Sequence, residues 1–354
     1  MDITITRAAS YKIKPPKWEN LGFGRVFSDH MFLMNYSPES GWHDARIVPF
    51  GNFEFSPALI TLHYGQAVFE GMKAYKTVDG GVQLFRAEQN IARLNNSNRR
   101  MCIPEIDEQF ALKAIRELVN LEREWVPDKE GASLYLRPFI FGTDEFLGVR
   151  PSDTYLFAVI CGPCGAYYEE GLKPVKIYIE TEYVRAVRGG VGEAKTEGNY
   201  AASLKAQKEA SEKGYSQVLW LDGRERKYVE EVGAMNVFFV IGNTVVTPAL
   251  EGSILPGITR ASAIEILRDK GYKVEERRLA VAELIASAKS GELKEAFGTG
   301  TAAVVSPIGE LCYEDVKYTI NGERIGKVSQ ELYDELTGIQ YGKIEDKRGW
   351  LSKI

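Results

Sequence analysis

Residues 189–200 read GGVGEAKTEGNY and place one lysine, Lys195, in a glycine-rich stretch directly before an expected helix. Three glycines precede the lysine within this stretch, and Gly198 follows it. Because glycine has no Cβ, such a stretch reaches backbone conformations closed to other residues and can come close to a ligand. An ordinary surface lysine does not need this setting. Lys195 is therefore the first candidate functional residue.

The composition restricts the class of protein. The chain has 354 residues, enough for two domains that each bury a core. Its apolar fraction of 44% and charged fraction of 26% are typical of a soluble globular protein. A net charge of −5 argues against nucleic acid or an anionic membrane as the main partner. Three histidines argue against a multi-histidine metal site, so we expect no metal.

The same composition indicates the compartment. Four cysteines in the whole chain are too few for a disulfide framework. The first residues, MDITITRAASYKIKPP, lack an apolar secretory core, and the longest apolar runs have the length of strands. We therefore expect a cytoplasmic protein that does not enter a membrane.

Strand and helix signals are mixed along the chain. Apolar spacing predicts a strand at residues 31–36, helices at 87–100 and from 107, and a further helix at 259–270. Short apolar runs separated by turn residues, such as Gly242-Asn243 and Asn321-Gly322, predict hairpins in the second half. Hairpins and helices together indicate the α+β class.

A break near residue 165 indicates two domains. Glycines and prolines from Gly162 to Pro174 interrupt regular structure, which predicts a linker at 165–176 between domains at 1–164 and 177–354. Cys161-Gly-Pro-Cys164 in this region has the sequence of a thioredoxin-type redox pair. Such a pair normally opens a helix, and the residues that follow do not continue as one. We therefore regard the redox interpretation as a minor alternative.

Several segments can meet an anion. In SLYLRPFIF, Tyr135 and Arg137 share one face of the expected strand. This face either binds an anionic ligand or, more simply, is exposed to solvent. LPGITR opens a helix with backbone N–H groups, and GTGTAA is a second turn of small residues. The sequence from Gly189 to Thr196 differs at one position from the nucleotide-binding motif GxxxxGK[ST], because Ala194 stands where the motif has its second glycine. The remaining interpretation is a lysine that forms a Schiff base.

The sequence also resembles a known family, the branched-chain amino-acid aminotransferases, which are pyridoxal-phosphate enzymes of fold type IV. The resemblance runs in order through LGFGRVFSDHM, LHYGQAVFEGMKAYK, ARLNNSNRRMCIP, SLYLRPFIFG, GGVGEAKTEGNYAASL, QVLWLDG, YVEEVGAMN, ILPGITR, AFGTGTAAVVSP and GIQYG. It covers nearly the whole chain. It implies a smaller N-terminal α/β domain and a larger C-terminal domain with a mixed-sheet pseudo-barrel. It also implies transamination between leucine, isoleucine or valine and 2-oxoglutarate by a homodimer.

The resemblance also implies residue roles. Lys195 matches the lysine of the internal aldimine, Tyr200 the tyrosine at the phenolic oxygen of pyridoxal 5′-phosphate, and Glu231 the carboxylate at its pyridine nitrogen. Other matches are with the phosphate cup (Arg93, Ile258, Thr259 and Thr301) and with the substrate pocket (Phe23, Tyr64, Phe69, Tyr135, Arg137 and Ala302). Because residues alternate along a strand, only one of the adjacent glutamates in YVEEV is expected to point inward.

Some positions depart from the family pattern. Position 234 is Ala where some relatives have a threonine. Glu197 stands where glycine is common and would be strained if that position needs a positive φ. The redox CxxC of some animal relatives falls at 303–306, where this chain has no cysteine. Within the same fold, a D-amino-acid transaminase or an aminodeoxychorismate lyase remains the alternative.

Overall fold

The computed structural model describes residues 1–165 and 172–354, which form two compact units. The first unit holds the described residues up to 165 together with Ala194–Glu197 and Ile339–Ile354. The second holds the described residues from 172 to 193 and Gly198–Gly338. The predicted linker lies partly outside the described residues. Segments from the middle and the end of the chain join the first unit.

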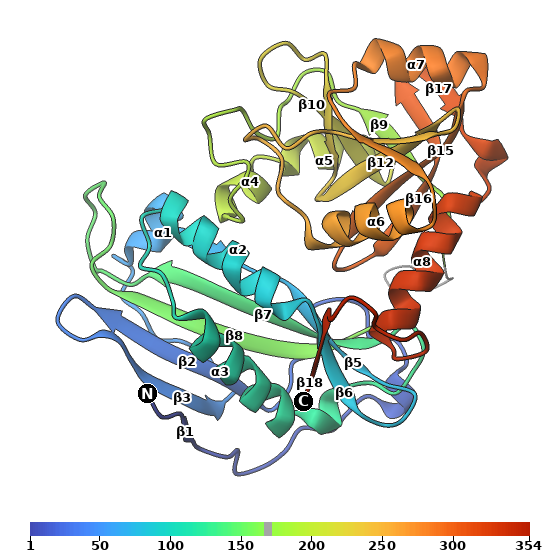
Figure 1. The fold of residues 1–354 in the computed structure, drawn as a ribbon. Coiled ribbons are helices and arrows are strands. Elements are labelled where there is room, and N and C mark those ends of the chain that lie inside the picture. The colour runs from blue at the N-terminus through green and yellow to red at the C-terminus, as the bar shows by residue number, and fades with distance from the viewer. Residues whose placement is uncertain (166–171) are drawn as a thin grey trace. The chain divides into compact units, whose positions relative to one another are not determined.

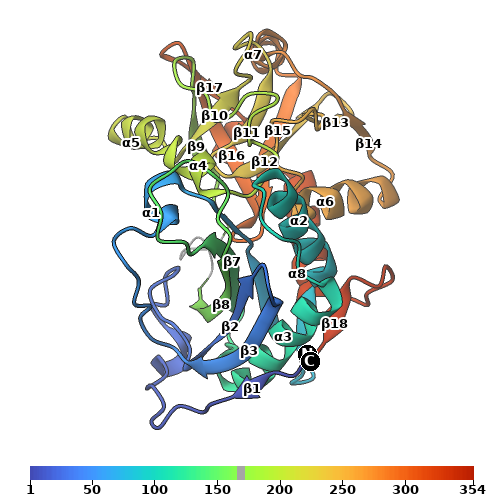
Figure 2. The same cartoon turned by 90° about the vertical axis from the view of Figure 1, so that its left-hand side faces the viewer.

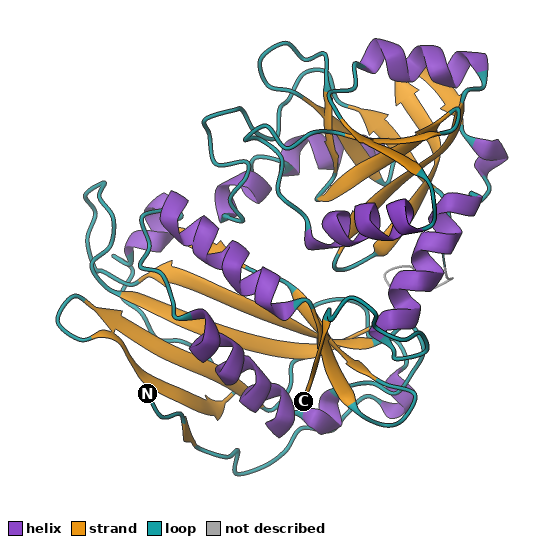
Figure 3. Ribbon diagram, in the orientation of Figure 1, coloured by secondary structure: helices purple, strands orange, loops and turns teal. Residues whose placement is uncertain are grey.

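The first unit is a nine-stranded mixed sheet with helices (Figures 1 and 3). Its strands are β1 (Thr4–Ile5), β2 (His30–Ser37), β3 (Gly41–Pro49), β4 (Ala67–Phe69), β5 (Met72–Lys76), β6 (Val82–Phe85), β7 (Ser133–Gly142), β8 (Tyr155–Cys164) and β18 (Leu351–Lys353). Its helices are α1 (Ile60–Tyr64), α2 (Ala87–Arg100) and α3 (Glu108–Leu121), with 3₁₀ turns at Pro16–Trp18 and Arg123–Trp125. The strand order is β1-β3-β2-β8-β7-β5-β6-β18, and β4 pairs with β7.

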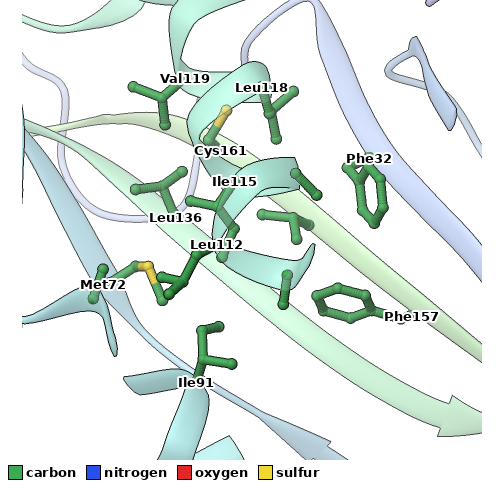
Figure 4. Packing of buried hydrophobic residues seen from close by; sticks show 14 of the residues in the cluster. Phe32, Met72, Ile91, Leu112, Ile115, Leu118, Val119, Leu136, Phe157 and Cys161 are labelled. Atoms are coloured by element: carbon green, nitrogen blue, oxygen red, sulfur yellow. The ribbon is translucent and has the colours of Figure 1, made fainter. Parts of the chain in front are cut away.

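The core of the first unit lies between its sheet and helices α2 and α3 (Figure 4). Ile91 of α2, with Ile115 and Leu118 of α3, is fully buried against Leu136 of β7. The alternation predicted for β7 is confirmed, since Leu134 and Leu136 are buried in this core while Tyr135 and Arg137 point to the other face. This second face carries the candidate site residues of β7.

The second unit is also built on a nine-stranded mixed sheet (Figure 2). Its strands are β9 (Val175–Ile179), β10 (Gln217–Leu221), β11 (Val229–Val232), β12 (Met235–Ile241), β13 (Thr244–Thr247), β14 (Lys273–Glu276), β15 (Leu293–Gly300), β16 (Val304–Tyr313) and β17 (Val316–Thr319). Its helices are α5 (Leu204–Glu212), α6 (Ile258–Asp269) and α7 (Val281–Ser290), with a 3₁₀ turn at Asn321–Glu323. Two more helices, α4 (Glu197–Ala201) and α8 (Lys327–Gln340), contain residues of both units.

Six of these strands close into a barrel. The order β11-β10-β9-β16-β15-β12 is completed by a pairing of β11 with β12, so both ends of the row are joined. Closure removes exposed strand edges and surrounds an apolar core that includes Leu219, Val237 and Leu311. The predicted α+β class with a C-terminal pseudo-barrel is confirmed.

Two local predictions are wrong. Cys161-Gly-Pro-Cys164 does not interrupt regular structure but forms the end of β8. A Cβ at Gly162 would lie 2.0 Å from the Val26 carbonyl oxygen, so this glycine permits close packing and makes no turn. Asn321-Gly322 opens a 3₁₀ turn after β17 and is not a hairpin. In the described part of the chain, no helix is both long and apolar enough to cross a bilayer.

Candidate active site

Lys195 belongs to a four-residue segment that packs within the first unit, although the residues on either side belong to the second. Its backbone N–H donates to Ser97 Oγ of α2 at 2.9 Å, and its carbonyl accepts the Phe69 N–H at 3.0 Å. The next residue, Thr196, forms a bridge with Val68, and its hydroxyl donates to the carbonyl of Ala67 at 2.7 Å. The lysine backbone is therefore held against β4 on one side and α2 on the other.

The amine of Lys195 lies in an apolar and electropositive environment. Its Nζ is 4.6 Å from the centre of the Phe69 ring. Burial of the amine, together with the charges of Arg93 and Arg137, lowers the pKa of Lys195 from 10.5 to about 8, although Glu70 and Tyr135 act in the opposite direction. A useful fraction of the amine is therefore neutral near physiological pH, as a nucleophile requires.

A buried ion pair adjoins this lysine. Arg93 of α2 donates through Nε to Glu70 Oε1 at 2.7 Å and through Nη2 to Glu70 Oε2 at 2.9 Å. The amide of Asn90 donates to Glu70 Oε2 at 2.8 Å. Burial opposes ionisation of Glu70, but the charges of Arg93 and Lys195 and these hydrogen bonds lower its pKa. Glu70 is therefore an anion that fixes the orientation of Arg93.

Glu70 was not predicted from the sequence. A carboxylate inside the apolar run AVFEGM was the available signal, since a charge within such a run must find a partner when it is buried. Ser97 was also missed, and no sequence signal distinguishes it from a helix-surface serine.

Four predicted pocket residues meet on one face of the first sheet. Arg137 Nη2 donates to the Tyr135 hydroxyl at 3.0 Å, and the guanidinium lies 4.7 Å from the centre of the Phe69 ring. The Phe23 ring packs edge-on against Tyr135 at 4.8 Å. Arg137 Nε is buried and has no hydrogen-bond partner among the described residues. Apolar rings therefore lie beside a guanidinium whose Nε–H can donate a hydrogen bond to a ligand.

Tyr64 has different surroundings. It ends α1, is 45% exposed, and its hydroxyl donates to the carbonyl of Leu147. Gly71, which was not predicted, lies directly under Tyr135, because a Cβ at this position would be 2.1 Å from the tyrosine hydroxyl. The position of Tyr135 therefore depends on the glycine of FEGMKAYK.

In the second unit, Glu231 lies in a row of paired polar residues across three strands of the barrel. Glu231 of β11 is opposite Asn236 of β12, which in turn is opposite Thr299 of β15. Asn236 Nδ2 donates to Glu231 Oε1 at 3.1 Å. The Thr299 hydroxyl is buried and has no hydrogen-bond partner in the described chain. The face therefore presents a buried carboxylate and a hydroxyl that can bind a further group.

Both glutamates of YVEEV are buried, so the expectation that only one points inward needs refinement. Glu231 is 3% exposed and Glu230 is 7% exposed. They do lie on opposite faces of β11, but both faces of this strand are covered. Glu230 accepts a hydrogen bond from Ser253, and burial raises its pKa.

The predicted phosphate-binding residues of the second unit lie at the start of a helix and at the end of a strand. Helix α6 begins at Ile258 and Thr259 after Gly257, and no side chain caps its N-terminus. Backbone N–H groups and the helix dipole favour an anion there. Thr301 and Ala302 form the turn between β15 and β16. Tyr200 lies in α4 and is partly buried.

The two alternative chemistries do not fit. Cys161 and Cys164 are both buried in β8, and burial raises the pKa of Cys161 to about 12, so this is not a reactive pair at a helix start. A phosphate loop needs a strand directly before it, but β9 ends at Ile179, well before Gly189. Glu197, whose strain was in question, begins α4 without a positive φ.

Comparison with known proteins agrees with this geometry. The model of the family described as amino-transferase class IV matches residues 67–311. Branched-chain-amino-acid aminotransferase 2 of Bacillus subtilis is 54% identical over 352 residues, which cover 99% of this chain and 97% of that protein. A probable branched-chain-amino-acid aminotransferase of Staphylococcus epidermidis is 57% identical over 353 residues, covering 99% and 98%.

A solved structure extends the similarity to the fold. The branched-chain amino acid aminotransferase of T.th., complexed with N-(5′-phosphopyridoxyl)-L-glutamate, has a TM-score of 0.73 and 28% identity, covering 91% of this chain and 97% of that one. The chain therefore belongs to the class IV aminotransferases and, within them, to the branched-chain amino-acid aminotransferase family.

Proposed function

We propose that the chain uses pyridoxal 5′-phosphate to transfer the amino group of leucine, isoleucine and valine to 2-oxoglutarate, giving the branched-chain 2-oxo acids and L-glutamate. The observation that carries the proposal is the Lys195 amine, whose pKa is lowered to about 8 on a backbone fixed from two sides. The names of the relatives support the substrates, and the phosphopyridoxyl-glutamate bound to one of them supports the cofactor and glutamate.

The residues present fit this cofactor. Among the described residues, the Thr299 hydroxyl beside the Glu231 row has no hydrogen-bond partner and no side chain caps the start of α6. These polar groups are suited to a polar ring and to a phosphate. Glu231 would hold the ring nitrogen, and Tyr200 would meet the phenolic oxygen, as the resemblance to the family implies. By the same resemblance, Arg93, the backbone of Ile258 and Thr259, and the Thr301 hydroxyl would bind the phosphate. When bound, the cofactor supplies the electron sink that accepts the electrons of the substrate Cα–H bond.

Lys195 carries the proton transfer. Its amine would hold the cofactor covalently and would act as the general base for the proton on the substrate Cα. A pKa near 8 suits this role, because the amine can both accept and return a proton near neutral pH. Phe69, 4.6 Å from the amine, excludes water on one side.

The pocket accepts two kinds of side chain in turn. Phe23 and Phe69 form apolar walls for the branched aliphatic groups. Arg137, with Tyr135 or Tyr64, would bind the γ-carboxylate of 2-oxoglutarate or glutamate. This role is supported by its buried Nε, which has no hydrogen-bond partner among the described residues. The turn at Ala302 meets the carboxylate next to the reacting carbon.

The test compares Lys195→Ala with wild type on a panel of amino donors with 2-oxoglutarate. We expect transamination of leucine, isoleucine and valine by wild type and its loss in the variant. Lys205→Ala is the matched control, since this lysine is 63% exposed and pairs with Glu209. Full activity of Lys195→Ala would refute the proposal.

We also propose a homodimer located in the cytoplasm. Apolar side chains are exposed on α1 and on the loop hydrogen-bonded to it, including Leu62 at 69%, Leu147 at 60% and Val149 at 84%. A second copy would cover this surface. All four cysteines are free, which is typical of a reducing compartment. Light scattering in solution tests the dimer, and a monomeric mass would contradict it.

A further inference from the structure

Two side chains hold the carboxylate of Glu231, one on each oxygen. Arg185 Nε lies 2.6 Å from Glu231 Oε2, and the two side chains are 8% and 4% exposed. Its N–H does not point at the oxygen in hydrogen-bond geometry, so this contact is an ion pair. Asn236 Nδ2 donates to Glu231 Oε1 at 3.1 Å. We call Arg185 and Asn236 the Glu231 clamp.

Each member of the clamp also binds a loop of the second unit. Asn236 Nδ2 donates to the Leu255 carbonyl at 3.0 Å, and a Cβ at Gly257 would lie 1.9 Å from Asn236 Oδ1. The amide is therefore packed against the segment that opens α6. Because Gly257 leaves no room for a side chain, the separation between the carboxylate and this helix start is fixed by Asn236.

Arg185 joins the carboxylate to two further carbonyl groups. Its Nη2 donates to Gly192 O at 3.2 Å and to Ser253 O. A Cβ at Gly192 would be 2.2 Å from Ser253 O, so these two loops touch at this point. Gly192 is three residues before Lys195 in the sequence. The guanidinium thus connects Glu231 to the glycine-rich stretch and to the segment before α6.

The neighbouring Glu230 shows the consequence of burial without such a clamp. Its Oε2 is buried and has no hydrogen-bond partner among the described residues, and burial raises its pKa. Ser253 donates to only one oxygen of Glu230, so the other oxygen has no hydrogen bond from the described residues to offset its burial. An arginine beside Glu231 favours the ionised form, and an amide on the other oxygen prevents rotation.

We propose that Arg185 and Asn236 are positioning residues for the cofactor, which keep Glu231 ionised and oriented toward the ring nitrogen and fix its distance from the phosphate-binding start of α6. This inference rests on the role of Glu231 in the proposed function. In this proposal, the clamp does not contact the ring. It acts by preparing the anion before the cofactor binds, which lowers the cost of ordering it.

The test measures the dissociation constants of the cofactor-free protein for pyridoxal 5′-phosphate and for its 1-deaza analogue, in which a C–H replaces the ring nitrogen. Wild type should bind the natural cofactor about tenfold to a hundredfold more tightly than the analogue, as a charged hydrogen bond predicts. In Arg185→Gln and Asn236→Ala this preference should fall to about twofold, while binding of the analogue changes little.

Three controls make the result decisive. Glu230→Gln should keep the wild-type preference, since Glu230 lies on the other face of β11. Arg185→Lys and Asn236→Gln cover the case in which the first variants do not fold, and both should also lose most of the preference, because neither side chain reproduces the paired contacts. Thermal unfolding confirms that each variant is folded.

The outcomes separate a positioning role of the clamp from a purely structural one. If the clamp variants weaken both ligands equally and keep the preference, the clamp is only structural and the inference is overturned. If wild type and Glu231→Gln bind both ligands equally, the role given to Glu231 fails and the inference fails with it. Transamination by wild type is measured separately, so a failure of the proposed reaction remains distinguishable.

Discussion

The lowered pKa of Lys195 has a direct consequence for its reactivity. At pH 7, a pKa near 8 leaves about one amine in ten neutral, against about one in 3,000 at the ordinary value of 10.5. Because only the neutral amine attacks, Lys195 should react ~300-fold faster than an exposed lysine with the same reagent, if access is equal. Trinitrobenzenesulfonate labelling of the cofactor-free protein, followed by peptide mapping across a pH series, measures this rate.

The environment of the amine predicts the direction of change in two variants. Arg93→Gln removes a positive charge and leaves Glu70 unbalanced, so the labelling midpoint should move to higher pH. Glu70→Gln leaves the charge of Arg93 unbalanced, so the midpoint should move to lower pH. Lys205, which is exposed and whose pKa is raised by Glu209, serves as the reference in the same sample. A Lys195 midpoint at or above that of Lys205, or shifts of opposite sign, would refute the electrostatic argument.

Three further predictions concern packing and thiols. Gly71→Ala places a carbon 2.1 Å from the Tyr135 hydroxyl, so kcat/KM for leucine should fall. Adding Tyr135→Phe removes the clashing hydroxyl and should restore part of kcat/KM, whereas no recovery would contradict the steric cause. Thiol titration of the native protein should find one fast-reacting cysteine, Cys102, because the other three are buried, whereas two fast thiols would contradict their burial. Glu122→Ala removes the acceptor of two buried donors, including His30, and should lower the free energy of unfolding in urea by about 2–5 kcal/mol; a loss below about 1 kcal/mol would contradict this.

Local patterns in the sequence predicted much of the secondary structure. The helix predicted at 87–100 is α2, because its apolar spacing matches the turn of the helix that faces the core. The alternation in β7 correctly separated Leu134 from Tyr135. The predictions were wrong where a residue type is required by packing against a distant segment and not by the local backbone. Gly162 was interpreted as a turn residue, but the position requires glycine because the Val26 carbonyl packs against it and leaves no room for a side chain.

The candidate site was predicted unevenly for the same reason. Lys195 stands out through its glycine-rich surroundings, and Glu231 through resemblance to a family. Glu70 depends on Arg93, which is far from it in the sequence and reaches it only after α2 has packed. Arg185 and Asn236 depend on carbonyl groups of separate loops. Such pairs have no fixed sequence spacing, so no single-sequence pattern reveals them.

The division of the first unit among three parts of the chain sets the order in which the protein can be completed during translation. The strand β18 pairs with β6, and β18 follows every other strand of the first unit in the sequence. The second unit ends at Gly338, before the last segment of the first unit begins at Ile339, so it can finish folding first. The nascent chain therefore carries an open sheet edge at β6 until β18 has been made, and a chain that lacks β18 would leave that edge exposed to other chains.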